Sequence, residues 1–248
     1  MSHPSTTILL ARSALAAAAV AVLSACSGAD PSSSATEGAA LGHSSSAQTA
    51  VWTQAYIGDA HAGSVNKKSN IQAKAALVLA SDGANLSLAL YFCGKGNTLS
   101  SDTQWLTGRV PLPPSGNIAD LNGVNLTSKA GWKAYVSMSG PGTVTRDDGV
   151  TFEWVASYVG DGSTYGLYRD VLPGGADATG ADLTGSVLGY IAWNGGSQGA
   201  LQRKDDTVFQ VTPVGPGAVD EQMVTFPNAT APLLVAPVDP IALTNPSL

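Results

Sequence analysis

Apolar and polar residues alternate along much of the chain with the two-residue period of β-strands. In the clearest segment, residues 86–93, Leu or Phe occupies every second position, and Ser, Ala, Tyr and Cys occupy the others. This segment and residues 75–80 flank the turn-forming sequence Ser-Asp-Gly-Ala-Asn, so the pattern predicts a β-hairpin. Further segments predicted as strands are 132–139, 150–159, 183–193 and 207–213.

Dipeptides that tolerate the positive φ of tight hairpin turns separate these segments. They are Asn122-Gly123, Asp148-Gly149, Asp161-Gly162 and Asn194-Gly195. Residues 51–213 show no sustained helical periodicity with capping residues. We therefore expect one all-β domain over residues 51–213, an antiparallel meander either closed as a barrel or folded as a sandwich.

Prolines set the C-terminal segment apart, because proline removes a ladder donor and is excluded from central strands. From residue 214 onward they stand at Pro216, Pro227, Pro232, Pro237, Pro240 and Pro246. Residues 214–248 are therefore predicted to form an extended, proline-rich tail. Within it, Val224–Phe226 or Leu233–Val235 can add to the surface of the domain.

The N-terminal region has the pattern of an export signal. Arg12 precedes an apolar run, Ala14–Leu23, which has the length of a signal-peptide core and is too short to span a bilayer. The run ends in Leu23-Ser24-Ala25-Cys26, which resembles the lipobox of bacterial lipoprotein signal peptides. Residues 1–25 are therefore predicted to be a lipoprotein signal peptide. In a plain secretory signal, which is the alternative, Cys26 would be incidental.

The lipobox resemblance implies that the thiol of Cys26 carries a diacylglyceryl group and that Cys26 becomes the first residue of the mature protein. Two acyl chains anchor a protein stably, so we expect attachment to the extracytoplasmic face of a bacterial cell membrane. Residues 26–50 are rich in Ser, Ala and Gly and bury too little apolar area to fold. They are predicted to be a flexible, disordered tether between the lipid and the domain.

The net charge argues against one class of partner. The chain carries a net charge of −6, and removal of residues 1–25 takes away Arg12 and no acid, which leaves −7. Nucleic-acid binding depends on a basic surface, so we expect no nucleic-acid partner. Electrostatic docking on anionic lipid headgroups is disfavoured for the same reason.

The chain contains two cysteines, Cys26 and Cys93. If Cys26 carries lipid, Cys93 has no partner within the chain, and the exported domain folds without a disulfide. No histidine or basic cluster lies near Cys93 in the sequence to lower the pKa of its thiol. Cys93 is therefore predicted to be a small buried residue on a strand.

Short motifs across residues 75–200 resemble those of poorly characterised exported proteins of actinobacteria. The motifs are Tyr91-Phe92-Cys93-Gly94, Trp105-Leu106-Thr107-Gly108, Gly166-Leu167-Tyr168-Arg169 and Gly189-Tyr190-Ile191. The resemblance implies a compact all-β exported domain and assigns no functional residue. Cys93 belongs to the shared pattern, which fits a structural role at least as well as a chemical one.

Residues able to perform catalysis are sparse. Asp59, His61 and Ser64 contain the elements of a triad, but such close spacing rarely lets three side chains meet. His61 is therefore predicted to lie in a solvated loop. The domain holds too few His and Cys residues for a zinc site, and no metal or cofactor is predicted. Acidic segments interpreted as hairpin turns rather than calcium loops are Asp147-Asp148-Gly149, Asp161-Gly162-Ser163 and Asp205-Asp206.

The five tryptophans are spread one per predicted strand, at Trp52, Trp105, Trp132, Trp154 and Trp193. This spacing predicts core anchors, although a barrel mouth lined with Trp and Tyr could also hold a ligand. The candidate ligand contacts are Trp105, Tyr91 and Trp193.

Taken together, these patterns predict a lipid-anchored, non-enzymatic domain that binds a small ligand, an envelope component or another protein. The alternative is an envelope hydrolase or a thiol enzyme that uses His61 or Cys93. A structural spacer without a binding site is the third possibility.

Overall fold

The structure is a computed structural model that describes residues 52–63, 72–155, 157–161, 166–217 and 221–244. The predicted signal peptide, the lipidation site Cys26 and the tether lie outside these residues, as does Ser64 of the possible triad.

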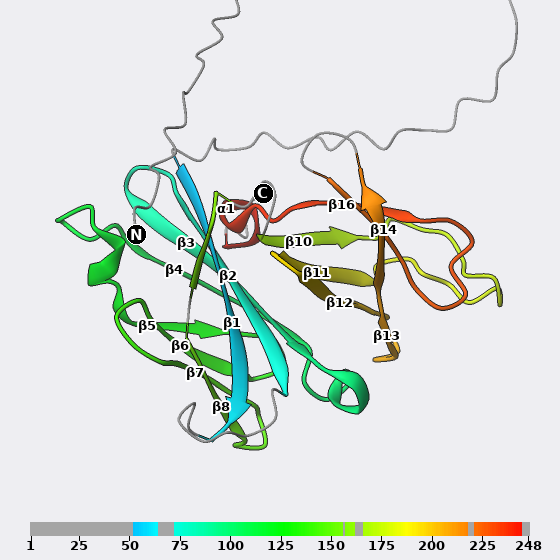
Figure 1. Cartoon of the computed structure of the whole chain (residues 1–248), viewed down its shortest axis with the longest axis horizontal. Coiled ribbons are helices and arrows are strands. Elements are labelled where there is room, and N and C mark those ends of the chain that lie inside the picture. Colours follow the sequence, from blue (N-terminus) through cyan, green and yellow to red (C-terminus); the bar gives the residue numbers. More distant parts are fainter. Residues whose placement is uncertain (1–51, 64–71, 156, 162–165, 218–220, 245–248) are drawn as a thin grey trace, which may run out of the picture. The chain divides into compact units, whose positions relative to one another are not determined.

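Eight antiparallel strands of this body form a closed barrel (Figure 1). Each strand pairs with the next, and β1 closes the barrel by pairing with β8 as well as with β2. The strands are β1 (Trp52–Ala62), β2 (Ala73–Ser81), β3 (Asn85–Gly94), β4 (Gln104–Pro111), β5 (Asn122–Thr127), β6 (Lys133–Ser137), β7 (Gly142–Thr145) and β8 (Thr151–Trp154). Of the two architectures that the sequence allows, this part of the chain adopts the barrel.

The barrel interior is filled by apolar side chains. The alternation in β3 directs its leucines and Phe92 inward, where the Phe92 ring lies 4.9 Å from that of Phe152 and 5.9 Å from that of Trp132. Trp154 is 1 % exposed and belongs to the same apolar core. The predicted alternation of residues 86–93 is confirmed, and so is the role of Trp132 and Trp154 as core anchors.

A second, seven-stranded antiparallel sheet follows the barrel and is nearly closed. Its spatial order is β13-β12-β11-β10-β16-β15-β14. Its strands are β10 (Gly166–Val171), β11 (Val187–Trp193), β12 (Gly196–Gln202), β13 (Val208–Gln210), β14 (Thr212–Pro216), β15 (Gln222–Thr225) and β16 (Leu233–Pro237). Tyr168 and Tyr190 lie in its core, with their rings 5.9 Å apart.

The C-terminal segment belongs to this sheet. The sequence separates residues 214–248 as a tail, whereas the structure pairs β16 with β10 in the middle of the sheet and β14 and β15 beyond it. Prolines are compatible with this position because they stand where ladder donors are not needed. Pro213 adjoins a bulge, and Pro216 and Pro237 end their strands. Helix α1 (Pro240–Thr244) follows.

The two sheets pack against each other through a shared apolar layer. The outward face of β3, with Ala89, Tyr91 and Cys93, meets Leu167 of β10 and Ile191 of β11. The side-chain amide of Gln198 donates hydrogen bonds of 2.7 Å to the carbonyl oxygens of Cys93 and Gly94. Both faces of β3 are therefore buried, although its sequence alternates like that of a half-buried strand.

Several strand boundaries differ from the sequence-based prediction. Asn122-Gly123 does not close a hairpin: Gly123 has a φ of 85° and sits at a register shift inside β5, which makes it a β-bulge. The strand predicted over 183–193 begins at Val187, because Gly185, with a φ of 74°, belongs to a turn.

The predicted strand 150–159 is divided in two. Residues 151–154 form β8, and β9 (Ser157–Gly160) continues along the same edge of β1, with Tyr158 exposed. Asp148-Gly149 and Asn194-Gly195 lie between paired strands as predicted, with φ values of 88° and 89° at the glycines.

The structure also contains the 3₁₀ helices η1 (Gly96–Thr98) and η2 (Ile118–Asp120). None of the helices within the described ranges has the length and hydrophobicity needed to span a bilayer.

Candidate ligand-binding cleft

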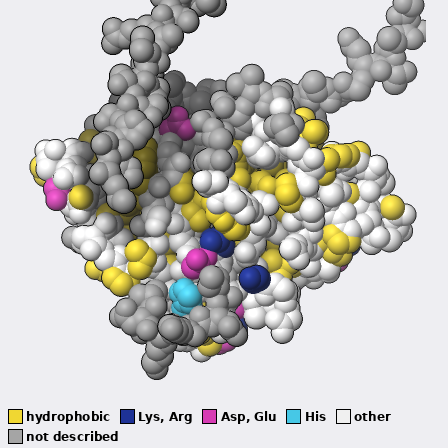
Figure 2. All heavy atoms as spheres, in the orientation of Figure 1, with side chains coloured by type: hydrophobic (Ala, Val, Ile, Leu, Met, Phe, Trp, Pro, Cys, Tyr) yellow, Lys and Arg dark blue, Asp and Glu magenta, His cyan; other side chains and the backbone are white. Residues whose placement is uncertain are grey.

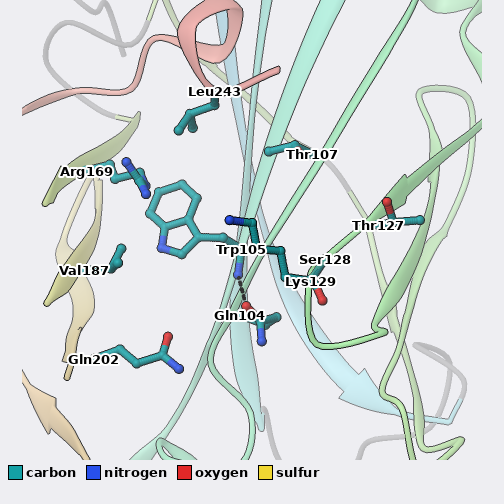
Figure 3. Close-up of a pocket in the computed structure, with 10 residues that line it drawn as sticks. All are labelled: Gln104, Trp105, Thr107, Thr127, Ser128, Lys129, Arg169, Val187, Gln202 and Leu243. Atoms are coloured by element: carbon teal, nitrogen blue, oxygen red, sulfur yellow. Dashed lines mark hydrogen bonds between the residues drawn. The ribbon is translucent and has the colours of Figure 1, made fainter. Parts of the chain in front are cut away.

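A cleft of about 550 Å³ lies along the seam between the two sheets. One wall comes from β4, a second from β10, β11 and β12, and a third from the end of β5 and the turn after it (Figure 3). Leu243 of α1 borders it at one end. The cleft lies outside the barrel, whose interior is filled by apolar side chains, and not at the barrel mouth, where the sequence predicts a possible ligand site.

Trp105 is the central side chain of the first wall (Figure 3). It stands directly opposite Tyr91 in the β3–β4 register, and the two rings stack with centroids 4.5 Å apart and planes at 28°. The Trp105 backbone N–H donates a 3.0 Å hydrogen bond to Oε1 of Gln104. This bond uses the carbonyl oxygen of the Gln104 side chain and not its amide nitrogen. Trp105 is only partly buried, so its ring borders the cleft.

Tyr91 supports Trp105 from behind and does not reach the cleft. It is 1 % exposed, and burial raises the pKa of its hydroxyl well above the ordinary value. Its ring lies against the backbone of Gly189 in β11, where a Cβ atom would stand 2.7 Å from Tyr91 Cε2. Of the predicted ligand contacts, Trp105 lines this cleft, while Tyr91 positions Trp105 and joins the two sheets.

Arg169 of β10 faces Trp105 across the cleft (Figure 3). Its guanidinium carbon lies 5.4 Å from the centre of the Trp105 ring, within the range of a cation–π interaction. Desolvation lowers the pKa of Arg169, while the charge of Asp170 opposes this shift. Because an arginine pKa starts far above neutrality, the guanidinium remains charged. Val187 and Gln202 continue this wall.

The third wall adds hydroxyl groups and a lysine. Thr127 and Ser128 line it, and the exposed side chain of Lys129 extends over the cleft toward Trp105 (Figure 3). The described residues around the cleft include two cations, two amides and three hydroxyls, but no carboxylate. Such a surface suits a polar ligand with several hydrogen-bonding groups.

A second cleft, of about 440 Å³, holds the third predicted contact, Trp193. The Nζ atom of Lys74 lies 4.2 Å from the centre of the Trp193 ring and forms an ion pair with Asp59. His61 also lines this cleft, but on strand β1 and opposite Glu153, not in the solvated loop that the sequence predicts. Figure 2 shows that charged side chains are few on this face of the described body.

Cys93 is fully buried beneath the second sheet. Burial raises the pKa of its thiol to about 11, so the thiol is protonated at neutral pH. It is a small core residue, as the sequence predicts, and its position disfavours the thiol-enzyme alternative.

The aspartates in the acidic turns accept hydrogen bonds from backbone N–H groups of the same turns. Asp148 accepts a 3.1 Å hydrogen bond from the N–H of Val150, and Asp205 accepts one of 3.1 Å from that of Thr207. These bonds lower the pKa values of both carboxyl groups. Within the described ranges no group of His, Cys, Asp and Glu side chains could hold a metal ion. Gly162 and Ser163 lie outside those ranges.

Arg169, Lys129 and Gln202 line the cleft, although no pattern in the sequence indicates them as ligand contacts. They come from three separate segments that only the packing of the two sheets brings together. No known family model matches the chain, and neither a curated protein nor a solved structure shows significant similarity to it.

Proposed function

We propose that this protein is a lipid-anchored binding protein of the bacterial cell envelope, whose seam cleft binds a saccharide. The observation that carries the proposal is the lining of the cleft: an indole ring, two amides, three hydroxyls and two cations beside a barrel that has no room for a ligand. Sugars combine apolar ring faces with many hydroxyls, and such a lining complements both.

The proposed anchor is the diacylglyceryl group on Cys26, at the extracytoplasmic face of the membrane. It rests on the lipobox-like sequence 23–26. Feeding cells an alkyne-tagged fatty acid should label the wild-type protein, and Cys26→Ala should abolish the label. Wild-type protein that stays unlabelled and is found in the medium would overturn the anchor and leave the cleft proposal intact.

Binding without catalysis is favoured by the surroundings of the candidate catalytic groups. Cys93 is buried and protonated, and the carboxylate of Asp59 is paired with Lys74. In the hydrolase alternative His61→Ala abolishes turnover, whereas in a binding protein it leaves affinity for a ligand in the seam cleft unchanged.

Saccharide binding is testable with N-acetylglucosamine and its oligomers, probes that carry a sugar ring, hydroxyls and an amide. We expect ligand-observed NMR to detect binding to the full chain in a neutral detergent. Trp105→Ala should weaken binding by about 5- to 150-fold, if a sugar face packed on the indole contributes about the 1–3 kcal/mol that a nucleobase stacked on an aromatic ring contributes.

Two further variants serve as a second test of the cleft and as a control. Gln202→Ala changes a partly buried side chain of the cleft with little risk to folding, and should also weaken binding. Trp193→Ala is the matched control, because Trp193 lines the second cleft. Weakening by Trp193→Ala but not by Trp105→Ala would show that the seam cleft is the wrong site. If N-acetylglucosamine, its oligomers and its acidic derivatives all fail to bind, the proposed function is refuted.

A further inference from the structure

Arg169 differs from the other described arginines in its partners. Arg109, Arg146 and Arg203 each form an ion pair with an aspartate, at N–O distances of 2.5 Å to Asp82, 2.7 Å to Asp102 and 3.6 Å to Asp205. Among the residues that the structure describes, Arg169 has no ion-paired carboxylate, and its guanidinium lies over the Trp105 ring. A partly buried cation in a cleft is thus left for an external anion.

The chain geometry explains why Asp170 does not neutralise Arg169. Neighbouring residues of a strand point to opposite faces, so the carboxylate of Asp170 lies on the other side of β10 from the cleft. There its Oδ1 accepts a 2.7 Å hydrogen bond from the N–H of Val171. Arg146 and Arg203, in contrast, each directly follow the end of a strand and pair with an aspartate in the hairpin turn that comes next, Asp148 and Asp205.

The cation–π contact with the Trp105 ring limits the positions of the Arg169 guanidinium. An arginine fork that is already ordered loses less conformational entropy when it binds a carboxylate or phosphate. Lys129 supplies a second, more flexible cation from the opposite wall (Figure 3). Both charges face a cleft without a lining carboxylate, on a chain whose net charge is −6.

We propose that the saccharide bound in the seam cleft carries an anionic group, a carboxylate or a phosphate, which Arg169 and Lys129 bind. This inference rests on the proposed saccharide function and specifies the substrate class. Arg169 forms the paired, charge-assisted hydrogen bonds, and Lys129 adds a longer-range attraction. The hydroxyls and amides of the other lining residues, among them Thr107 and Gln202, bind the neutral part of the sugar.

Matched sugars test the anionic group directly. N-acetylmuramic acid is N-acetylglucosamine with an added lactyl carboxylate, and N-acetylglucosamine 6-phosphate carries a phosphate on the same ring. With the full chain, we expect at least one of these acids to bind roughly 10- to 100-fold more tightly than N-acetylglucosamine, the usual range for hydrogen bonds to charged groups. Which acid binds more tightly distinguishes carboxylate from phosphate. Raising the salt concentration should reduce this preference.

Variants locate the subsite. Arg169→Met should remove the preference for the acid, Arg169→Lys should restore part of it, and Lys129→Met should reduce it several-fold. Lys95→Met is the control for net charge, since Lys95 is exposed and lies outside this cleft. If Arg169→Met does not fold, the preference for the acid measured with Lys129→Met tests the proposal, because the side chain of Lys129 is exposed and its replacement should not disturb folding.

The possible failures are distinguishable. Equal affinity for N-acetylglucosamine and both acids would overturn the anionic subsite but leave the saccharide function standing. A preference that survives both Arg169→Met and Lys129→Met, or that is lost equally in Lys95→Met, would refute the assignment to these residues. Failure of every sugar to bind would refute the proposed function itself.

Discussion

The barrel and the second sheet use the same kind of strand but end in different ways. Every strand from β1 to β8 has a hydrogen-bonded neighbour on each side, whereas the second sheet ends at β13 and β14. Closure of the barrel pairs the backbone N–H and C=O groups of its edge strands with each other, so no other element is needed to cover them. The second sheet contributes one of its faces to the shared layer that holds Tyr91 and Cys93.

This difference shows where a binding site can form. The barrel interior is filled, so the barrel acts as a support for its own outer surface. The second sheet covers the outer face of β3 and leaves Trp105 on β4 partly exposed at its border. The seam therefore places rigid barrel residues opposite residues of the cover, and each half contributes part of the cleft.

The largest effect is expected from Phe92 in the barrel. Phe92→Ala removes a fully buried ring that contacts Phe152 and Trp132, and should lower the free energy of unfolding by about 3–5 kcal/mol. The matched change in the other half is Phe226→Ala, at a ring that is 5 % exposed. Because a nearly closed sheet can collapse more easily into a cavity, its cost should be about 3 kcal/mol or less.

Denaturant unfolding measures both variants. Equal losses of stability, or a larger loss for Phe226→Ala, would contradict the expectation that the barrel core relaxes less around a cavity than the core of the second sheet. If the second sheet unfolds separately in Phe226→Ala, two transitions should replace one.

The next effect probes the contact between the halves. Gly189→Ala places a Cβ atom 2.7 and 2.8 Å from ring carbons Cε2 and Cε1 of Tyr91, and should cost about 1–3 kcal/mol through overpacking. Gly174→Ala is the control, since the nearest atom to its Cβ would be Thr184 Oγ1 at 3.8 Å.

A double-mutant cycle identifies the cause of the Gly189→Ala effect. In a Tyr91→Ala background the same substitution should cost much less, because the overlapping ring is gone. An undiminished cost in that background would mean that Tyr91 does not connect the sheets through Gly189.

Sequence patterns predict the structure of the barrel better than that of the seam between the two sheets. Alternation in residues 86–93 predicts both the hairpin and the inward leucines, because one face of β3 is uniformly large and apolar. It does not predict that the other face is buried as well. Ser87 and Ala89 are small, and such residues occur both on solvent-exposed faces and where two sheets pack closely. Their burial depends on elements that pack over them, which the local pattern does not reveal.

Part of the cleft could have been found from sequence and part could not. The two-residue period predicts that Arg169 and Asp170 point to opposite faces, which marks Arg169 as an arginine without an adjacent partner on its own face. Its approach to Trp105 depends on how two separate sheets pack, and local patterns carry no information about that contact. The prolines predict a tail over residues 214–248 in which Val224–Phe226 or Leu233–Val235 can add to the domain, and the structure has strands at both places, β15 and β16.

A smaller effect concerns the thiol between the halves. Burial raises the pKa of Cys93 in the folded protein to about 11, above that of an exposed thiol. Its contribution to stability is therefore fully present below the unfolded-state pKa near 8.5 and is lost as the pH rises toward about 11. Between about pH 8 and pH 10 the wild type should lose about 1–2 kcal/mol more than Cys93→Ala.

Urea unfolding of both proteins at the two pH values tests this effect. Cys26 is present in both proteins and so does not account for their difference. Parallel loss of stability in wild type and Cys93→Ala would show that the thiol is reached by solvent, and hence that the two sheets separate readily.

The smallest effect compares one turn in each half. Asp82 accepts hydrogen bonds of 3.0 and 2.7 Å from the N–H groups of Ala84 and Asn85 in the β2–β3 turn, and pairs with Arg109. Asp82→Ala should cost about 1 kcal/mol, the usual net value of such bonds. Asp205, in the β12–β13 turn, accepts one such bond and lies 3.6 Å from Arg203, so Asp205→Ala should cost less.

Acid titration separates the two turns further. Backbone hydrogen bonds lower the pKa of Asp82, so its contribution is present above the ordinary carboxyl pKa near 4 and is lost as the pH falls through the lower folded-state value. Stability measured from neutral to acid pH should therefore converge for wild type and Asp82→Ala. If the two curves stay apart at low pH, the loss of stability in Asp82→Ala comes from packing. The carboxylate charge of Asp82 then does not make the β2–β3 turn more stable than the β12–β13 turn.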